Sequence, residues 1–221
     1  MKRNVSIEEI SDGRLYGAND MVKADTRGCE GCSACCHGMG NSIILDPYDI
    51  WQLCRYLGQP FERLLEQYLE LNVVDGLILP NLRMTGEKET CGFLDHQGRC
   101  SIHPARPGVC RLFPLGRVYE GRDFQYFLQV HECSRCKTKV KVKRWVNVPE
   151  FSQYEAYIRQ WHYFLEDVSV FLEREEQEGL RKQVTLYLLK EFFVKPWEEE
   201  AFYLQFERRM EAARQFLGFA G

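Results

Sequence analysis

The sequence predicts a helix-rich α+β protein, in which a small metal-organised cysteine domain with a short antiparallel sheet precedes a C-terminal helical extension. All ten cysteines lie between residues 29 and 136, and none follows. Beyond Pro149, apolar residues instead recur at helical spacing. We therefore expect three parts: an N-terminal segment (1–24), a cysteine-cluster metal-binding domain (25–148) and a C-terminal helical region (149–221).

The composition is that of an ordinary globular protein. Of the 221 residues, 28% are charged and 45% hydrophobic, and the net charge is -3. A dedicated nucleic-acid-binding protein is usually basic, so nucleic acid is not an expected partner. No apolar run approaches the roughly 20 residues that span a bilayer. The first 20 residues lack the apolar core of a signal peptide, so the expected location is cytoplasmic, without a membrane partner.

Two helices are expected between the first and second groups of cysteines. The stretch LDPYDIWQLCRYLG predicts a helix with Asp46 as N-cap, Pro47 at the first helical position and Gly58 at its end. A second helix is expected in PFERLLEQYLEL, residues 60–71. Short strands are expected at 43–45 and 77–79.

The end of the cysteine region predicts strands. GRVYEGRDFQYFLQV predicts two strands around the turn at 121–123. KVKVKRWVNV, residues 139–148, alternates charged and apolar residues, which is typical of a half-buried strand. Five basic residues from 137 to 144 could contact nucleic acid, but lysines that protect an edge strand are the better interpretation.

The C-terminal region predicts three helices. The first is defined by an apolar stripe that forms core or a partner surface: Phe151, Tyr154, Ile158, Trp161, Leu165, Val168 and Leu172. A second helix is expected from about 179 to 194, and a third from near Pro196 to just before Gly218.

The cysteines fall into three groups. The first is Cys29, Cys32, Cys35 and Cys36, the second is Cys91, Cys100 and Cys110, and the third is the C-x2-C pair Cys133 and Cys136. In a reducing cytoplasm such clusters indicate metal ligands or redox groups rather than disulfides. Cys54 shares the apolar face of the predicted helix and is expected in the core.

Clustered thiolates suit zinc and iron–sulfur clusters, both of which favour tetrahedral sulfur ligation. Three cysteines at x2 spacing, with a fourth from elsewhere, resemble the ligation of a four-iron, four-sulfur cluster. Adjacent side chains in regular backbone point in different directions, so Cys35 and Cys36 are not expected to bind one metal together. All nine clustered cysteines are candidate ligands, for one site or two. The third group either completes a site, forms a redox pair or is structural.

Other side chains near these thiols have candidate roles. Arg106 and Arg111 could offset the negative charge of a cluster or hold an anionic ligand, and they are the candidate cofactor-binding residues. An apolar shell is expected from Phe93, Leu94, Ile102, Val109, Leu112 and Phe113. The histidines near cysteines are each expected outside the ligand set: His37, His96, His103 and His131.

The four cysteines of the first group, followed by CGFL and CSIHPARPGVCRLFP, resemble the bacterial CxxCxxCC (YkgJ-type) cysteine-cluster family, which is described as zinc- or iron-chelating. The resemblance covers roughly residues 27–136 and includes the Arg106-Pro107 pair. Members of this family have no settled activity. A flagellin lysine methylase carries a related cysteine motif, and that resemblance implies an iron–sulfur cluster, although this chain is shorter and shows no methyl-donor pocket.

The principal hypothesis is therefore metal chelation through clustered thiolates, with an iron–sulfur cluster ahead of zinc and with a protein as a further partner. The alternative is an iron–sulfur-dependent enzyme that acts on a protein by methyl or redox transfer, so enzyme status stays open. An enzyme predicts a pocket beside Arg106 and Arg111. A structural site predicts closed ligation by four thiolates and loss of folding when the metal is removed.

Overall fold

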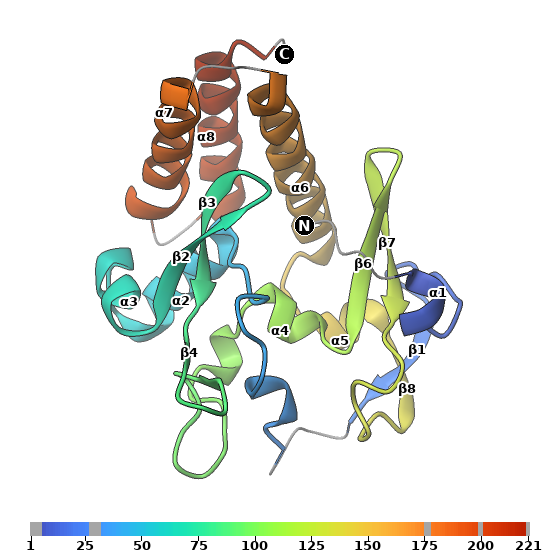
Figure 1. Ribbon diagram of the computed structural model, residues 1–221. Helices are drawn as coiled ribbons and strands as arrows, with labels where there is room; N and C mark the ends of the chain where they lie inside the picture. The colour runs from blue at the N-terminus through green and yellow to red at the C-terminus, as the bar shows by residue number, and fades with distance from the viewer. Residues whose placement is uncertain (1–5, 27–31, 175–177, 199–200, 220–221) are drawn as a thin grey trace.

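The computed structural model describes residues 6–26, 32–174, 178–198 and 201–219 (Figure 1). The helices are α1 (Ile7–Ile10), η1 (Ala34–Cys36), α2 (Pro47–Leu57), α3 (Phe61–Gln67), η2 (His103–Ala105), α4 (Gly108–Leu112), α5 (Val142–Val146), α6 (Phe151–Arg174), α7 (Glu178–Leu189), the π-helical turn η3 (Lys190–Val194) and α8 (Phe202–Leu217). The strands are β1 (Met21–Asp25), β2 (Leu69–Val74), β3 (Leu77–Leu82), β4 (Met84–Thr85), β5 (Thr90–Cys91), β6 (Leu115–Glu120), β7 (Asp123–Leu128) and β8 (Thr138–Lys141).

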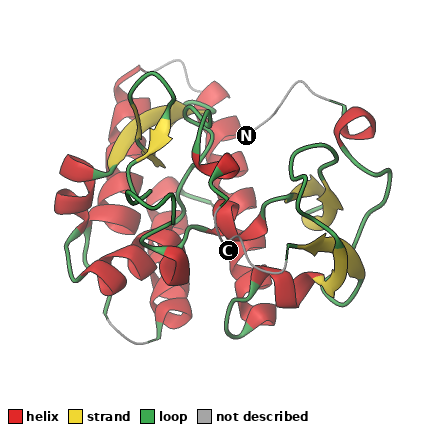
Figure 2. Ribbon diagram, turned by 90° about the horizontal axis from the view of Figure 1, so that it is seen from below, coloured by secondary structure: helices red, strands yellow, loops and turns green. Residues whose placement is uncertain are grey.

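The helix-rich α+β class is confirmed, with short antiparallel sheets and a helical C-terminal part. The strands of the described residues form separate antiparallel pairs rather than one sheet: β1–β8, β2–β3, β4–β5 and β6–β7. Figure 2 shows these pairs as short pieces set between helices. Because each pair is small, it must pack against helices to be stable.

The predicted helix α2 is confirmed with both of its ends. Asp46 is the N-cap and forms a capping box with Asp49, in which each carboxylate accepts from the other's backbone N–H at 2.9 and 3.2 Å. Pro47 occupies the first turn, and Gly58 ends the helix with φ 63°, a conformation that glycine adopts without a Cβ clash. Local sequence therefore fixes where this helix begins and ends.

The second predicted helix is shorter than expected, and the chain changes to a strand. Helix α3 ends at Gln67, and β2 begins at Leu69 and pairs with β3 in a register that sets Leu69 opposite Leu82. Both leucines are buried, so burial in the tertiary structure, rather than the helical spacing of apolar residues, determines the conformation of this segment. The predicted strand at 43–45 is wrong in extent, since only the single bridge Ile44–Asn81 forms.

The prediction for KVKVKRWVNV is half wrong. Its beginning forms β8, which pairs with β1, but the chain then turns into the short helix α5. Val142 and Val146 are both fully buried, and their spacing of four places them on one side of a helix. The Trp145 indole N–H donates to the carbonyls of Leu112 and Phe113 at 3.2 Å each, which ties α5 to the end of α4. The hairpin β6–β7 around residues 121–122 is confirmed.

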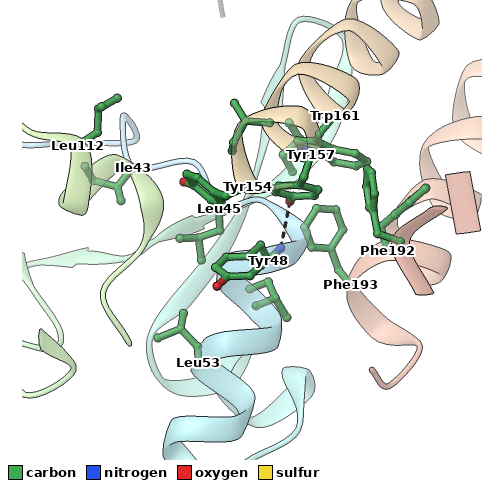
Figure 3. Close-up of a cluster of buried hydrophobic side chains, with 14 of the residues drawn as sticks. Ile43, Leu45, Tyr48, Leu53, Leu112, Tyr154, Tyr157, Trp161, Phe192 and Phe193 are labelled. Carbon is green, nitrogen blue, oxygen red and sulfur yellow. Dashed lines mark hydrogen bonds between the residues drawn. The ribbon is translucent and has the colours of Figure 1, made fainter. Parts of the chain in front are cut away.

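The C-terminal helices α6, α7 and α8 lie side by side in Figure 1. Rings of α6 and α8 contact Tyr48 of α2. The predicted stripe is core, because Tyr154, Trp161 and Val168 of α6 are buried. Figure 3 shows how Tyr48 of α2 meets this core: its backbone N–H donates to the Tyr157 hydroxyl at 3.0 Å. The last helix begins later than predicted, at Phe202.

A single hydrophobic cluster runs from Tyr16 to Leu217 and includes residues of both the cysteine region and the helical region. The domain boundaries given above stay a prediction. Among the described residues, no helix combines the length and the apolar character that crossing a membrane requires.

Candidate metal centre

The first cysteine group is held beside the second by a backbone bridge. Cys35 and Cys36 lie in the single 3-10 turn η1, and the next residue, His37, forms a β-bridge with Thr90. The His37 Nδ1 atom lies 3.1 Å from the Thr90 hydroxyl, which strengthens the same bridge. Because Thr90 directly precedes Cys91, this contact brings two cysteine groups together that are more than 50 residues apart in sequence.

Cys91 and Cys100 are connected by a tight loop. The Asp95 carboxylate accepts from the backbone N–H groups of Gln97 and Arg99 at 2.8 Å each, which closes the turn between the two cysteines. Beyond the turn, Cys100 forms a bridge with Leu94, three residues after Cys91. The loop therefore returns Cys100 to the neighbourhood of Cys91.

Cys110 lies on the short helix α4, which α2 holds in place. The Asp49 Oδ1 atom accepts from the backbone N–H of Gly108, the first residue of α4, at 2.7 Å. Arg111 is buried and donates to the carbonyl of Pro104, which fixes α4 against η2. A Cβ at Gly108 would lie 2.7 Å from the Tyr154 hydroxyl, so only glycine fits this contact with α6. The position of Cys110 thus depends on residues outside the cysteine segments.

The second-group thiols and Cys35 are electrostatic neighbours. Burial raises the pKa of the Cys110 thiol, and Cys91, Cys35 and Cys100 raise it further, together with Asp49. Burial likewise raises the pKa of Cys100, with contributions from Cys91 and Cys35. Repulsion between thiolates is the physical cause, so these four thiols from three separate segments lie within range of one another.

The adjacent cysteines of η1 behave as a pair. A hydrogen bond from the Cys36 thiol lowers the pKa of Cys35 to about 6, against burial and with help from Arg106. The same contact raises the pKa of Cys36. The turn that carries both thiols is closed by the bond from Cys36 N–H to the Ser33 carbonyl at 2.8 Å. That Cys35 and Cys36 do not bind one metal together stays a prediction.

Two of the thiols accept backbone N–H donors in the same way. Burial raises the pKa of both Cys91 and Cys100, and a backbone N–H bond to each sulfur, from Phe93 and from Ile102 respectively, offsets part of that rise. A donor two residues after the cysteine stabilises the charged thiolate that a metal requires.

This donor set fits a soft metal. It offers several thiols, amide donors that favour thiolates, and a mutual repulsion that a bound cation would relieve. No three metal-binding side chains in the described part of the chain are close enough as placed to hold an ion. The thiols are gathered, but they are not closed into a ligand shell.

The remaining cysteines differ in their surroundings. Cys136 donates to the Ala24 carbonyl on β1 at 3.3 Å, and the β1–β8 pair lies apart from the loop after β4 in Figure 1. Cys54 is half-buried against the core, as expected. Cys32 and Cys133 are half-buried, and no disulfide links one described cysteine to another. Cys29 lies outside the described residues.

The predicted apolar shell is present in part. Phe93, Ile102 and Leu112 are buried, and the Phe93 ring stacks on Tyr68 with centroids 4.3 Å apart. Val109 is instead exposed. Residues that sequence reasoning missed are Asp49, which holds α4, and Arg55, which joins Arg106 and Arg111 around one cleft. The Asp-x-x-Asp spacing of the capping box was a readable signal for Asp49.

Comparison with known proteins agrees with this site. Residues 28–134 match the family model CxxCxxCC, described as "Putative zinc- or iron-chelating domain". Searches of the curated proteins and of the solved structures return no significant match. The matched segment contains both cysteine groups that the structure brings together, as well as Cys133. Residues 28–134, which are 107 of the 221 residues, thus form a domain similar to the CxxCxxCC family.

Proposed function

We propose that the gathered thiolates bind an iron–sulfur cluster of the four-iron, four-sulfur type, with zinc as the alternative metal. The observation that carries this proposal is that the bridges His37–Thr90 and Leu94–Cys100 bring Cys35, Cys91 and Cys100 towards one another, while Asp49 holds the helix that carries Cys110. Four thiolates complete the tetrahedral sulfur ligation that zinc prefers, and they also match the number of thiolates that hold a four-iron cluster.

The remaining thiols of the two groups surround this set. Cys36 contacts Cys35 directly, and Cys29 and Cys32 precede it at the same x2 spacing. In this proposal, Cys29, Cys32 and Cys36 either replace a ligand of the first set or form part of a second metal site. Cys133 and Cys136 stay candidate ligands, and the Cys136 contact with β1 favours a structural role for that pair.

Iron is placed ahead of zinc because the chain has more clustered cysteines than the four that one zinc ion needs, and because it lacks a clear Cys/His zinc spacing. Two of the histidines near the cysteines have other contacts: His37 with the Thr90 hydroxyl at 3.1 Å, and His103 with the Arg106 guanidinium at 3.0 Å. A mixed Cys/His zinc site would need one of them to turn away from its contact. An iron–sulfur cluster would supply one-electron chemistry or would serve as a structural centre.

The first test is metal content, measured with a visible spectrum on protein purified without oxygen. About four irons per chain with equal acid-labile sulfide, and a brown colour that bleaches on reduction, would support the cluster. One zinc per chain in a colourless protein would support the alternative metal. Protein that binds neither after reconstitution, although it is folded, would overturn the proposal.

A second function is favoured by one observation. A cleft lined by Arg106 and Arg111 adjoins the cysteine region, as an enzyme that acts beside the cluster would require. The candidate reaction is methyl or redox transfer to a protein. An enzyme of the redox type must cycle its cluster, so repeated reduction with dithionite and reoxidation should leave the iron content unchanged. Loss of iron in the first cycle would instead favour chelation alone.

A further inference from the structure

A cleft of about 580 Å³ lies where α2, the η2–α4 segment and residues 147–149 meet. This volume is within the range of about 300–1,000 Å³ that is common for small-molecule sites. Its lining includes Tyr48, Trp51, Arg55, His103, Arg106 and Arg111. Metal binding, as proposed above, uses none of these side chains as ligands.

The lining is strongly positive. It contains three arginines and no aspartate or glutamate. Arg111 is buried and donates to the Pro104 carbonyl, which is uncharged. No salt bridge involving Arg55 or Arg106 is found among the described residues. The cleft therefore holds more positive charge than the protein neutralises, which favours an anion.

Arg106 provides an independent indication of a ligand. Its Nη1 atom lies 3.0 Å from His103 Nε2, but its Nε–H is buried without an acceptor among the described residues. A buried donor without a partner is costly, and such groups in proteins are almost always satisfied. A carboxylate or phosphate can accept from two N–H groups of one guanidinium at once, so such an anion fits this donor.

The cleft also has an aromatic side. The Arg55 guanidinium lies 4.7 Å from the centroid of the Trp51 ring, and Trp51 packs on Tyr48 at 5.2 Å. The Trp51 indole N–H donates to the Glu198 carbonyl at 3.1 Å, which fixes the ring in place. A flat ring in the ligand could pack on this surface while its acidic group meets the arginines.

We propose that this cleft binds a small organic anion, a phosphate or carboxylate that carries a flat ring. The acidic group lies between Arg106 and Arg55, and the ring lies against Trp51. Inorganic phosphate has the charge but no ring, so it binds more weakly. The proposal holds for either metal, because the cleft is built from α2 and η2–α4 side chains rather than from thiols.

The test is calorimetric titration of the metal-loaded full chain with phenyl phosphate, benzoate, inorganic phosphate and the neutral benzyl alcohol. We expect one site per chain for phenyl phosphate or benzoate, at least tenfold weaker binding of inorganic phosphate, and none of benzyl alcohol. Absence of binding by both aromatic anions would overturn the proposal. Binding of a polyglutamate peptide, with neither aromatic anion bound, would also overturn it and would assign the cleft to an acidic protein segment.

Variants test the residues. Arg55→Ala removes an exposed side chain and should weaken binding of phenyl phosphate about tenfold or more without changing metal content. The matched control is Arg63→Ala, an equally exposed arginine on α3 that pairs with Glu66 at 2.7 Å outside the cleft, and it should change nothing. Equal effects of the two variants would contradict the assignment.

The variant Arg106→Gln distinguishes two roles of Arg106: binding of the anion in the cleft, and compensation of the negative charge of the thiolates. If Arg106 binds the anion, the variant loses phenyl phosphate binding at least tenfold and keeps its metal. If Arg106 only balances the charge of the thiolates, the variant loses metal while the wild type binds no aromatic anion, and the cleft proposal is overturned. Metal content is measured separately in each variant, so failure of the metal proposal can be told apart from failure of the cleft proposal.

Discussion

The loops that carry the second cysteine group and the C-terminal helices are built by opposite means. After Cys91, the last residue of β5, residues 92–112 contain only the short elements η2 and α4, which are three and five residues long. The shape of this segment depends on turns and on single hydrogen bonds such as that of Asp95. Helix α6 is 24 residues long, and the helical region packs around fully buried rings, among them Phe164, Phe192, Phe193 and Phe206.

The difference shows which region has a source of stability of its own. Aromatic burial stabilises the helices without any ligand. Short loops with half-buried thiols bury little apolar area, so they need a further interaction, and a metal bound by their thiolates would supply it. Removal of the metal should therefore loosen the loops and leave the helices folded.

The largest expected effect comes from the ligands themselves. Cys110→Ser and Cys32→Ser should each lower bound metal, Cys110→Ser almost completely, and should destabilise the loops, because structural thiolate sites contribute folding free energy outright. Elemental analysis and hydrogen exchange of residues 91–112 measure both effects. Cys54→Ser is the matched control, since Cys54 packs against the core on α2, and its metal content should be unchanged. If Cys54→Ser lost the metal and Cys32→Ser did not, the assignment of ligands would be wrong.

The next effect is a cavity in the helical core. Phe192→Ala should lower the free energy of unfolding by about 3–5 kcal/mol, because the ring is fully buried and packs on Trp161 at 4.9 Å. Chemical denaturation followed by circular dichroism measures this. Metal per folded chain should not change. Phe216→Ala is the control: that ring is 52% exposed, and its removal should cost under about 1 kcal/mol.

A third variant tests the link between the two regions. Asp49→Ala removes the acceptor of the buried Gly108 N–H and should cost about 1–3 kcal/mol. Because α4 carries Cys110, metal affinity should also fall. Asp49→Asn keeps a carbonyl acceptor and should lose less of both, as measured by denaturation and by chelator competition. Equal metal affinity in Asp49→Ala and wild type would show that the helices do not position Cys110.

The smallest effect concerns pH and a histidine of α6 that packs on β6. Burial lowers the pKa of His162 to about 4, and its ring stacks on Tyr119 with centroids 3.4 Å apart. The unfolded chain takes up this proton near pH 6.5, so the folded state is destabilised as pH falls from about 6.5 towards 4, by about 1–2 kcal/mol after allowance for partial exposure.

Denaturation midpoints across this pH range measure the effect. His162→Phe should flatten the dependence, whereas the exposed His96→Gln should keep it. A slope that survives in His162→Phe would assign it to other groups.

Sequence reasoning succeeded where the signals are local. Asp46, Pro47 and Gly58 predicted both ends of α2, and the 121–122 turn predicted the β6–β7 hairpin. It failed where burial decided the conformation. The segment after Gln67 became a strand because Leu69 pairs across to Leu82, and Val142 entered a helix because it and Val146 are buried together.

For the site, the sequence by itself determined the type of side chains available. It shows that soft thiols are clustered, how they are grouped, and that two arginines lie near them in the chain. Only the tertiary structure decided which thiols meet. Cys110 is close to Cys91 because Asp49 holds α4, and Cys35 is close because His37 bridges to Thr90. Arg55 likewise lines one cleft with Arg106 and Arg111 only because α2 and the η2–α4 segment meet in the folded chain. Contacts between neighbours in sequence follow from local geometry, whereas contacts across 50 residues depend on how the intervening helices pack.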